Sequence, residues 1–140
     1  MNWDQRFMDL ARHVAGWSKD PSTQVGAVLV GRDKREICFG YNGFPPGIRD
    51  TPERLADRET KYKLIQHAER NALDNCRFDP KGGLLYVTHC PCTECAKSII
   101  SKGISEVVHL AQPEFDLRWQ PHLEWVRFML DEAGVQLRVL

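Results

Sequence analysis

The chain has 140 residues, and its 19 Lys and Arg residues balance 19 Asp and Glu residues, so its formal net charge is zero. This length suits one domain spanning residues 1–140. With 42% hydrophobic and 27% charged residues, the composition excludes disordered, collagen-like and membrane-embedded chains. The zero net charge disfavours a general nucleic-acid-binding protein, which usually carries a basic surplus.

The spacing of apolar, Gly and Pro residues predicts helices and strands that alternate along most of the chain. In chain order, the predicted elements are a helix over 4–19, strands over 25–30 and 36–40, a helix over 67–76, a strand over 84–88, a helix over 93–102, a strand over 106–110, a helix over 119–133 and a strand over 135–139. Such alternation favours a largely parallel sheet covered by helices on both faces. The predicted fold class is therefore α/β, as one three-layer α/β/α domain.

Four segments carry further expectations. The helix over 4–19 has an apolar stripe that we expect in the core, formed by Phe7, Leu10, Ala11, Val14 and Trp17. Gly and Ala residues in the strand over 25–30 indicate that another element approaches it closely. Segment 41–47 is too rich in Gly and Pro for regular structure. Segment 49–63 is strongly charged, and we expect it to be a solvated surface segment.

The cysteines are the most informative part of the composition. They stand at positions 38, 76, 90, 92 and 95. The N-terminal residues lack the basic start and apolar core of a secretory signal, and no run of about 18 apolar residues occurs, so the expected location is the cytoplasm, with no membrane partner. In a reducing compartment, a crowded cysteine cluster indicates metal binding or redox chemistry before it indicates disulfides.

Two short motifs together predict a zinc site. His67 begins a His-Ala-Glu motif, and Cys92 and Cys95 belong to a Pro-Cys-x-x-Cys motif. Imidazole nitrogen and thiolate sulfur suit zinc, and three protein ligands leave a fourth position open for water, as in catalytic sites. Glu69 is placed to exchange a proton with that water, whose pKa zinc lowers to about 7. His-x-Glu followed by Pro-Cys-x-x-Cys is the signature of zinc-dependent base deaminases.

Other interpretations leave some of these residues unexplained or require a further ligand. A thioredoxin-like dithiol at Cys92 and Cys95 would leave His67 and Glu69 without a role. A closed structural zinc site would need a fourth ligand, for which only His89 or Cys90 stands nearby in the sequence. The remaining cysteines and histidines are expected to pack in the interior or lie on the surface: Cys38, Cys76, His13, His109 and His122.

Four stretches of the sequence resemble the deoxycytidylate deaminases of the zinc-dependent cytidine deaminase superfamily. They are SKDPSTQVGAVLV (18–30), GYNGFPPG (40–47), HAERNAL (67–73) and YVTHCPCTECAKSII (86–100). The resemblance spans roughly residues 15–110 and implies a central five-stranded mixed sheet with flanking helices. It implies hydrolytic deamination of dCMP to dUMP and ammonia, which supplies dUMP for thymidylate synthesis.

The resemblance also implies roles for particular residues. His67, Cys92 and Cys95 would hold one zinc ion, and Glu69 would be the proton shuttle. The substrate contacts would come from Asn42 to the deoxyribose, from Ser22 and Thr23 to sugar and phosphate, and from the backbone around Ala68 and Cys92 to the pyrimidine edge. Many members of this family are homo-hexamers activated by dCTP and inhibited by dTTP, with Mg²⁺ bound to the triphosphates.

The sequence departs from the family pattern at two places. Phe115 stands where some members have a Tyr whose hydroxyl approaches the nucleotide, and His89-Cys90 replaces a pair that is usually apolar. Near Phe115, Arg118 could reach a phosphate and Trp119 could stack on a base, although a surface Arg and a core Trp are the simpler expectation.

Alternative functions remain open at this point. A bifunctional deaminase would accept dCTP as well as dCMP. A tRNA or nucleic-acid deaminase would need a basic footprint that a net charge of zero does not supply. A catalytically silent nucleotide-binding module would use the same zinc scaffold without releasing ammonia.

Overall fold

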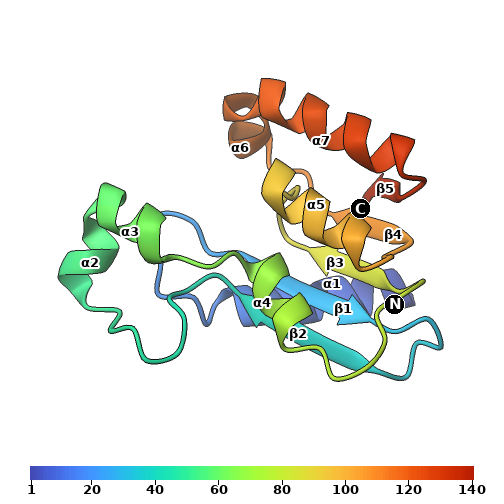
Figure 1. Ribbon diagram of the computed structural model, residues 1–140, viewed down its shortest axis with the longest axis horizontal. Helices are drawn as coiled ribbons and strands as arrows, with labels where there is room; N and C mark the ends of the chain where they lie inside the picture. The colour runs from blue at the N-terminus through green and yellow to red at the C-terminus, as the bar shows by residue number, and fades with distance from the viewer.

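The computed structural model describes residues 1–140 as a central sheet with helices on both of its faces (Figure 1). The helices are α1 (Trp3–Ala15), α2 (Pro52–Ala56), α3 (Arg58–Leu64), α4 (Ala68–Asp74), α5 (Thr93–Ser101), α6 (Pro113–Arg118) and α7 (Gln120–Glu132). The strands are β1 (Gly26–Val30), β2 (Ile37–Tyr41), β3 (Leu84–Val87), β4 (Glu106–His109) and β5 (Gln136–Val139). No helix has the length and apolar character needed to cross a bilayer.

The five strands lie in the order β2-β1-β3-β4-β5. Strand β1 pairs antiparallel with both β2 and β3, whereas β3, β4 and β5 pair parallel. The prediction of a five-stranded mixed sheet in an α/β fold is therefore confirmed, but the prediction of a largely parallel sheet is wrong. The reason is that β1 runs opposite to both of its neighbours: a tight turn at 31–36 returns the chain into β2, and β3 also enters the sheet antiparallel to β1.

Successive side chains along each strand pack into two separate cores, one on each face of the sheet. Val28 and Val30 pack with α1 on one face of the sheet. Ala27 and Leu29 face the opposite side, where α4, α5 and α7 form the larger core. Because successive strand residues point to opposite faces, five consecutive buried residues in β1 require cover on both sides. This arrangement confirms the three-layer prediction.

Two glycines allow helices to approach the sheet closely. A Cβ at Gly26 would lie 1.9 Å from the carbonyl oxygen of Ala11 in α1. A Cβ at Gly40 would lie 2.4 Å from the backbone nitrogen of Ala72 in α4. The close approach predicted for the strand over 25–30 therefore occurs, and a second one seats α4 against β2.

Gly40→Ala is expected to lower the free energy of unfolding by about 2–3 kcal/mol, because the added methyl group meets helix backbone rather than a flexible side chain. Chemical denaturation measures this loss. Gly43→Ala is the matched control in the following loop, where the nearest atom to an added Cβ is 3.9 Å away in the Tyr41 ring. Equal stability of the two variants would contradict the packing described for α4.

Several predicted boundaries are wrong for local reasons. Helix α1 ends at Ala15, and Trp17 lies beyond it with 47% of its surface exposed, so it is not a core residue. The charged segment over 49–63 is not merely solvated, because it contains α2 and α3 and buries both Leu55 and Lys61. Helix α6 was not expected, since its short, polar sequence has no apolar stripe.

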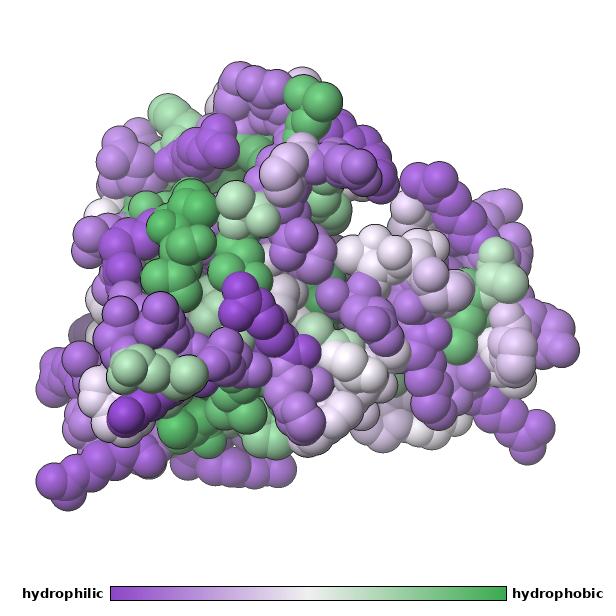
Figure 2. All heavy atoms as spheres, turned by 180° about the vertical axis from the view of Figure 1, so that it is seen from behind, coloured by the Kyte–Doolittle hydropathy of each residue, from purple (hydrophilic) through white to green (hydrophobic).

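Helices α2 and α3 form an arm that projects from the body of the molecule (Figure 1). Figure 2, seen from behind, shows an opening between this arm and the main body. The arm is tied back by an isolated bridge between Gly43 and Gln66 and by an ion pair between Lys61 and Asp20. The arm lies at the end of the sheet where β1 begins and β3 ends.

Candidate metal centre and substrate cavity

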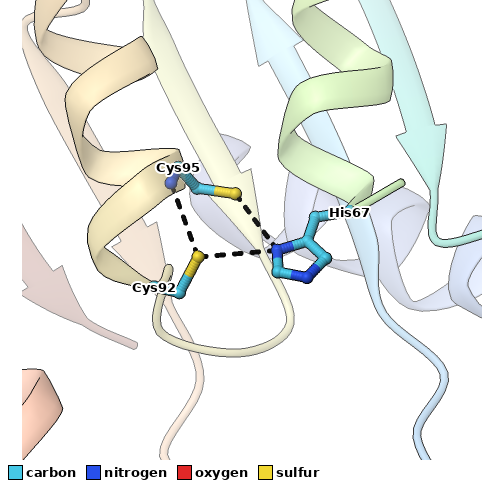
Figure 3. A group of neighbouring side chains, drawn as sticks. All are labelled: His67, Cys92 and Cys95. Atoms are coloured by element: carbon cyan, nitrogen blue, oxygen red, sulfur yellow. Dashed lines mark hydrogen bonds between the residues drawn. The ribbon is translucent and has the colours of Figure 1, made fainter. Parts of the chain in front are cut away.

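The predicted zinc ligands meet at the starts of two helices. His67 is the N-cap residue of α4, and Cys92 is the N-cap residue of α5, whose first turn contains Cys95. Figure 3 shows the three side chains turned toward one another from these two helices. The N-termini of helices carry partial positive charge, which favours thiolates over thiols.

The distances among these side chains fit a zinc ion. His67 Nδ1 lies 3.5 Å from Cys92 Sγ and 3.4 Å from Cys95 Sγ, and the ligand atoms of all three residues lie within 4.8 Å of one another. Tetrahedral zinc, with bonds of about 2.0–2.1 Å to nitrogen and 2.3 Å to sulfur, separates such ligand atoms by about 3.6 Å. The cluster contains neither His89 nor Cys90. Three side chains are therefore close enough together to hold one ion.

The electrostatics differ among the cysteines of this segment, and only Cys92 has a lowered pKa. Hydrogen bonds from the Cys95 thiol and from the His67 ring hold the pKa of Cys92 well below that of an ordinary thiol. The backbone N–H of Cys95 also donates to Cys92 Sγ, at 3.4 Å. Burial instead raises the pKa of Cys90 to about 12, so its thiol stays protonated at neutral pH. The hydrogen bond with Cys92, together with burial, raises the pKa of Cys95, so in the cluster Cys92 carries the thiolate and Cys95 the proton.

Glu69 lies in the first turn of α4 and is buried, with 5% of its surface exposed. Burial is the main cause that raises the pKa of Glu69 to about 7, while the nearby His67 ring opposes the shift. A carboxyl group with this pKa can hold or release a proton at neutral pH. Its position two residues after His67 places it beside the metal ligands, as the sequence predicted.

A cavity of about 600 Å³ opens beside this cluster. It is lined by every predicted site residue except Cys95: Ser22, Thr23, Asn42, His67, Ala68, Glu69, Cys92, Arg118 and Trp119. Cys95 is buried behind the cavity wall in α5. Residues from the loop before β1, the arm, the two helix starts and the α6–α7 corner thus converge on one cavity, although they are far apart in the sequence.

Asn42 holds the loop before β1 in place. Its Nδ2 donates to the carbonyl oxygen of Thr23 at 2.9 Å and to Asp20 at 3.4 Å, while its Oδ1 accepts from the N–H of Val25 at 2.8 Å. Both hydrogens of the amide are therefore used within the protein. Only Oδ1, with its second lone pair, remains to accept a hydrogen bond from a ligand.

An aromatic wall, formed by His89, Phe115, Trp119 and His122, lines the side of the cavity opposite the arm. Successive ring centroids along it are 5.0, 6.3 and 6.2 Å apart. Trp119 is 38% exposed, so the expectation of a core Trp is wrong. The reason is that Trp119 lies between α6 and α7, where the chain turns at the cavity mouth.

Sequence reasoning missed two contributors to the cavity. His122 was expected to be a packing or surface residue, but its Nε2 accepts a hydrogen bond from the N–H of Thr93, at 3.2 Å, beside the ligand Cys92. Lys61 was hidden in the charged segment over 49–63, and its burial depends on a partner, Asp20, that is 41 positions away. No local pattern reveals either contact.

Comparison with known proteins agrees with this geometry. Residues 1–111 match the model of the cytidine and deoxycytidylate deaminase zinc-binding region. The chain belongs to this deaminase family. An uncharacterized deaminase of Aliivibrio fischeri is 42% identical, covering 96% of this chain and 91% of its own length. Human deoxycytidylate deaminase is 38% identical, covering 99% of this chain and 79% of its own length.

A solved structure shows the same fold in this deaminase family. The crystal structure of dCMP deaminase from the cyanophage S-TIM5 in complex with dCMP and dUMP superimposes with a TM-score of 0.76. The match covers 100% of this chain and 99% of that chain at 23% identity. The five-stranded sheet with its flanking helices is therefore the fold of a deaminase domain.

Proposed function

We propose that this protein deaminates dCMP to dUMP and ammonia with the help of one zinc ion. The observation that carries the proposal is the cluster of His67, Cys92 and Cys95 beside a buried Glu69, with His67, Glu69 and Cys92 lining a cavity of about 600 Å³. The chain's similarity to deoxycytidylate deaminases over nearly its whole length supports the same reaction.

The metal ligands and Glu69 have different roles in the hydrolysis. His67, Cys92 and Cys95 would hold the zinc ion, which when bound would lower the pKa of a water molecule towards neutral pH. Glu69 accepts a proton from water as the water oxygen adds to carbon 4 of cytosine, and it delivers that proton to ring nitrogen 3. It then passes the proton of the new hydroxyl group to the amino group, which leaves as ammonia when the C4–N bond breaks. A carboxyl group whose burial raises its pKa to about 7 can act as base and acid in turn.

The remaining cavity residues orient the nucleotide in this proposal. The free lone pair of Asn42 Oδ1 accepts from the deoxyribose hydroxyl, and Ser22 and Thr23 contact the sugar and phosphate side. The backbone around Ala68 and Cys92 reads the pyrimidine edge. Trp119 offers a face on which the base can stack, and Arg118 is an exposed cation at the mouth.

A substrate screen on zinc-loaded protein tests the proposed function. Ammonia release is measured with dCMP, dCTP, deoxycytidine and single-stranded DNA at equal concentrations. We expect the highest kcat/KM with dCMP and no ammonia from DNA. Comparable rates with dCTP would make the enzyme bifunctional. No ammonia from any cytosine compound would leave a zinc-stabilised nucleotide-binding module as the function.

Regulation, assembly and location are further parts of the proposal. The family resemblance predicts activation by dCTP, inhibition by dTTP with Mg²⁺, and a homo-hexamer. An exposed apolar face on the edge strand β2, formed by Ile37, Phe39 and Tyr41 with the neighbouring Trp17, supports self-association. A cytoplasmic location would keep the two zinc thiolates reduced.

A further inference from the structure

Lys61 is an unusual member of the charged arm. Only 7% of its side chain is exposed, whereas 73% of the Lys63 side chain two residues later is exposed. Its Nζ lies 3.0 Å from Asp20 Oδ1, whose side chain is 6% exposed, and 3.1 Å from Ser22 Oγ. A buried ion pair of this kind adds little net stability, because desolvation opposes the attraction, so its position over the cavity needs another explanation.

Asp20 fixes the geometry on the other side of this ion pair. Its Oδ1 accepts the backbone N–H groups of Ser22 and Thr23, at 2.8 and 3.3 Å, in addition to the Lys61 ammonium. One carboxylate oxygen therefore sets both the conformation of the loop and the location of the cation. The side chains of Lys61 and Ser22 are held together before any ligand arrives.

The hydrogen-bond inventory leaves two free donors. The Lys61 ammonium has three N–H groups, and Asp20 and Ser22 take two of them. Because Ser22 Oγ accepts from Lys61, its own hydroxyl hydrogen is free to donate. Both side chains line the cavity. Two adjacent donors suit a ligand group that only accepts hydrogen bonds, such as a phosphate.

Charge favours the same kind of ligand. Asp20 balances Lys61, and Arg58, one helical turn earlier, lines the cavity and adds a positive charge. The opposite wall offers only Arg118 as a cation, and that residue is exposed and makes no hydrogen bond within the chain. The prearranged donors are therefore on the arm side of the cavity.

We propose that Lys61 and Ser22 recognise the substrate phosphate, so that the arm selects phosphorylated nucleotides over nucleosides. This inference rests on the proposed function, and it gives the charged segment a role in specificity. It assigns the phosphate to the arm side and not to Arg118 at the α6–α7 corner.

Binding of dUMP and deoxyuridine to zinc-loaded protein, measured by calorimetry, tests this assignment without requiring turnover. Lys61→Met is expected to weaken dUMP binding by about 10- to 100-fold, the loss typical of a hydrogen bond to a charged group, with little change for deoxyuridine. Ser22→Ala removes a hydroxyl group at an exposed position, which the fold tolerates. It is expected to weaken dUMP binding by less than Lys61→Met does, again with little change for deoxyuridine. In kinetics with dCMP, both variants should raise KM and leave kcat within a few fold.

Lys63→Met is the matched control, since it removes the same charge from an exposed position on the same helix. An equal loss of dUMP and deoxyuridine binding in both Lys61→Met and Ser22→Ala would overturn the proposal, because the residues would then only support the loop. So would a phosphate-specific loss found in Arg118→Met but in neither of these variants. Wild-type protein that binds dUMP more tightly than deoxyuridine yet releases no ammonia would refute the proposed function and leave the phosphate assignment standing.

Discussion

Glu69→Gln is expected to reduce turnover of dCMP by about 10²- to 10⁴-fold, the usual contribution of general acid–base catalysis, while the protein still binds one zinc ion per chain. Glutamine fills the same buried space but cannot accept the proton of the water or deliver it to the ring. Ammonia release gives the rate, and elemental analysis gives the zinc content of the same preparation.

Glu94→Gln provides the comparison, because Glu94 also lies in the first turn of a helix beside the metal site but is exposed and paired with Lys97. Its rate should match that of the wild type. The assignment of Glu69 as the proton shuttle is wrong if Glu69→Gln turns over dCMP at the wild-type rate. Loss of zinc from the variant would instead mean that Glu69 supports the ligands.

Cys92→Ala is expected to lower zinc affinity by more than about 100-fold, beyond the effect of losing an outer hydrogen-bond partner, and to reduce ammonia release to background. The physical reason is that only His67 and Cys95 would remain to hold the ion. Competition with a chromogenic chelator measures the affinity.

Cys90→Ala tests whether the site is open or closed. Cys90 stands two residues before Cys92, but its buried thiol has a pKa raised to about 12 and is not among the clustered ligand atoms. We expect this variant to bind zinc as tightly as the wild type. A loss of affinity close to that of Cys92→Ala would identify Cys90 as a fourth ligand and a structural site.

The zinc site was predictable because its signal is local. His67 and Glu69 are two residues apart, Cys92 and Cys95 are three apart, and each pair stands where a helix begins. Short spacings at a helix start fix the directions of side chains almost independently of the rest of the fold. The layers were predictable for a similar reason, since periodic apolar residues mark the buried side of each element.

The other side of the cavity was not predictable because its contacts join distant segments. Lys61 looks like any solvated lysine until Asp20, 41 positions earlier, is placed beside it. His122 acquires its contact with Thr93 only when α7 packs on α5. The strand order likewise depends on which edge of the sheet each strand joins, and apolar periodicity carries no information about that choice.

The cavity wall that includes His122 comes largely from the part of the chain that follows the zinc motifs. The match to the family model ends at residue 111, and Phe115, Trp119 and His122 after it line the cavity. Most of one wall of the cavity is thus encoded after the zinc motifs, whereas the proposed phosphate donors Lys61 and Ser22 lie before them. Changes after residue 111 would therefore alter this wall of the cavity while His67, Glu69, Cys92 and Cys95 stay in place.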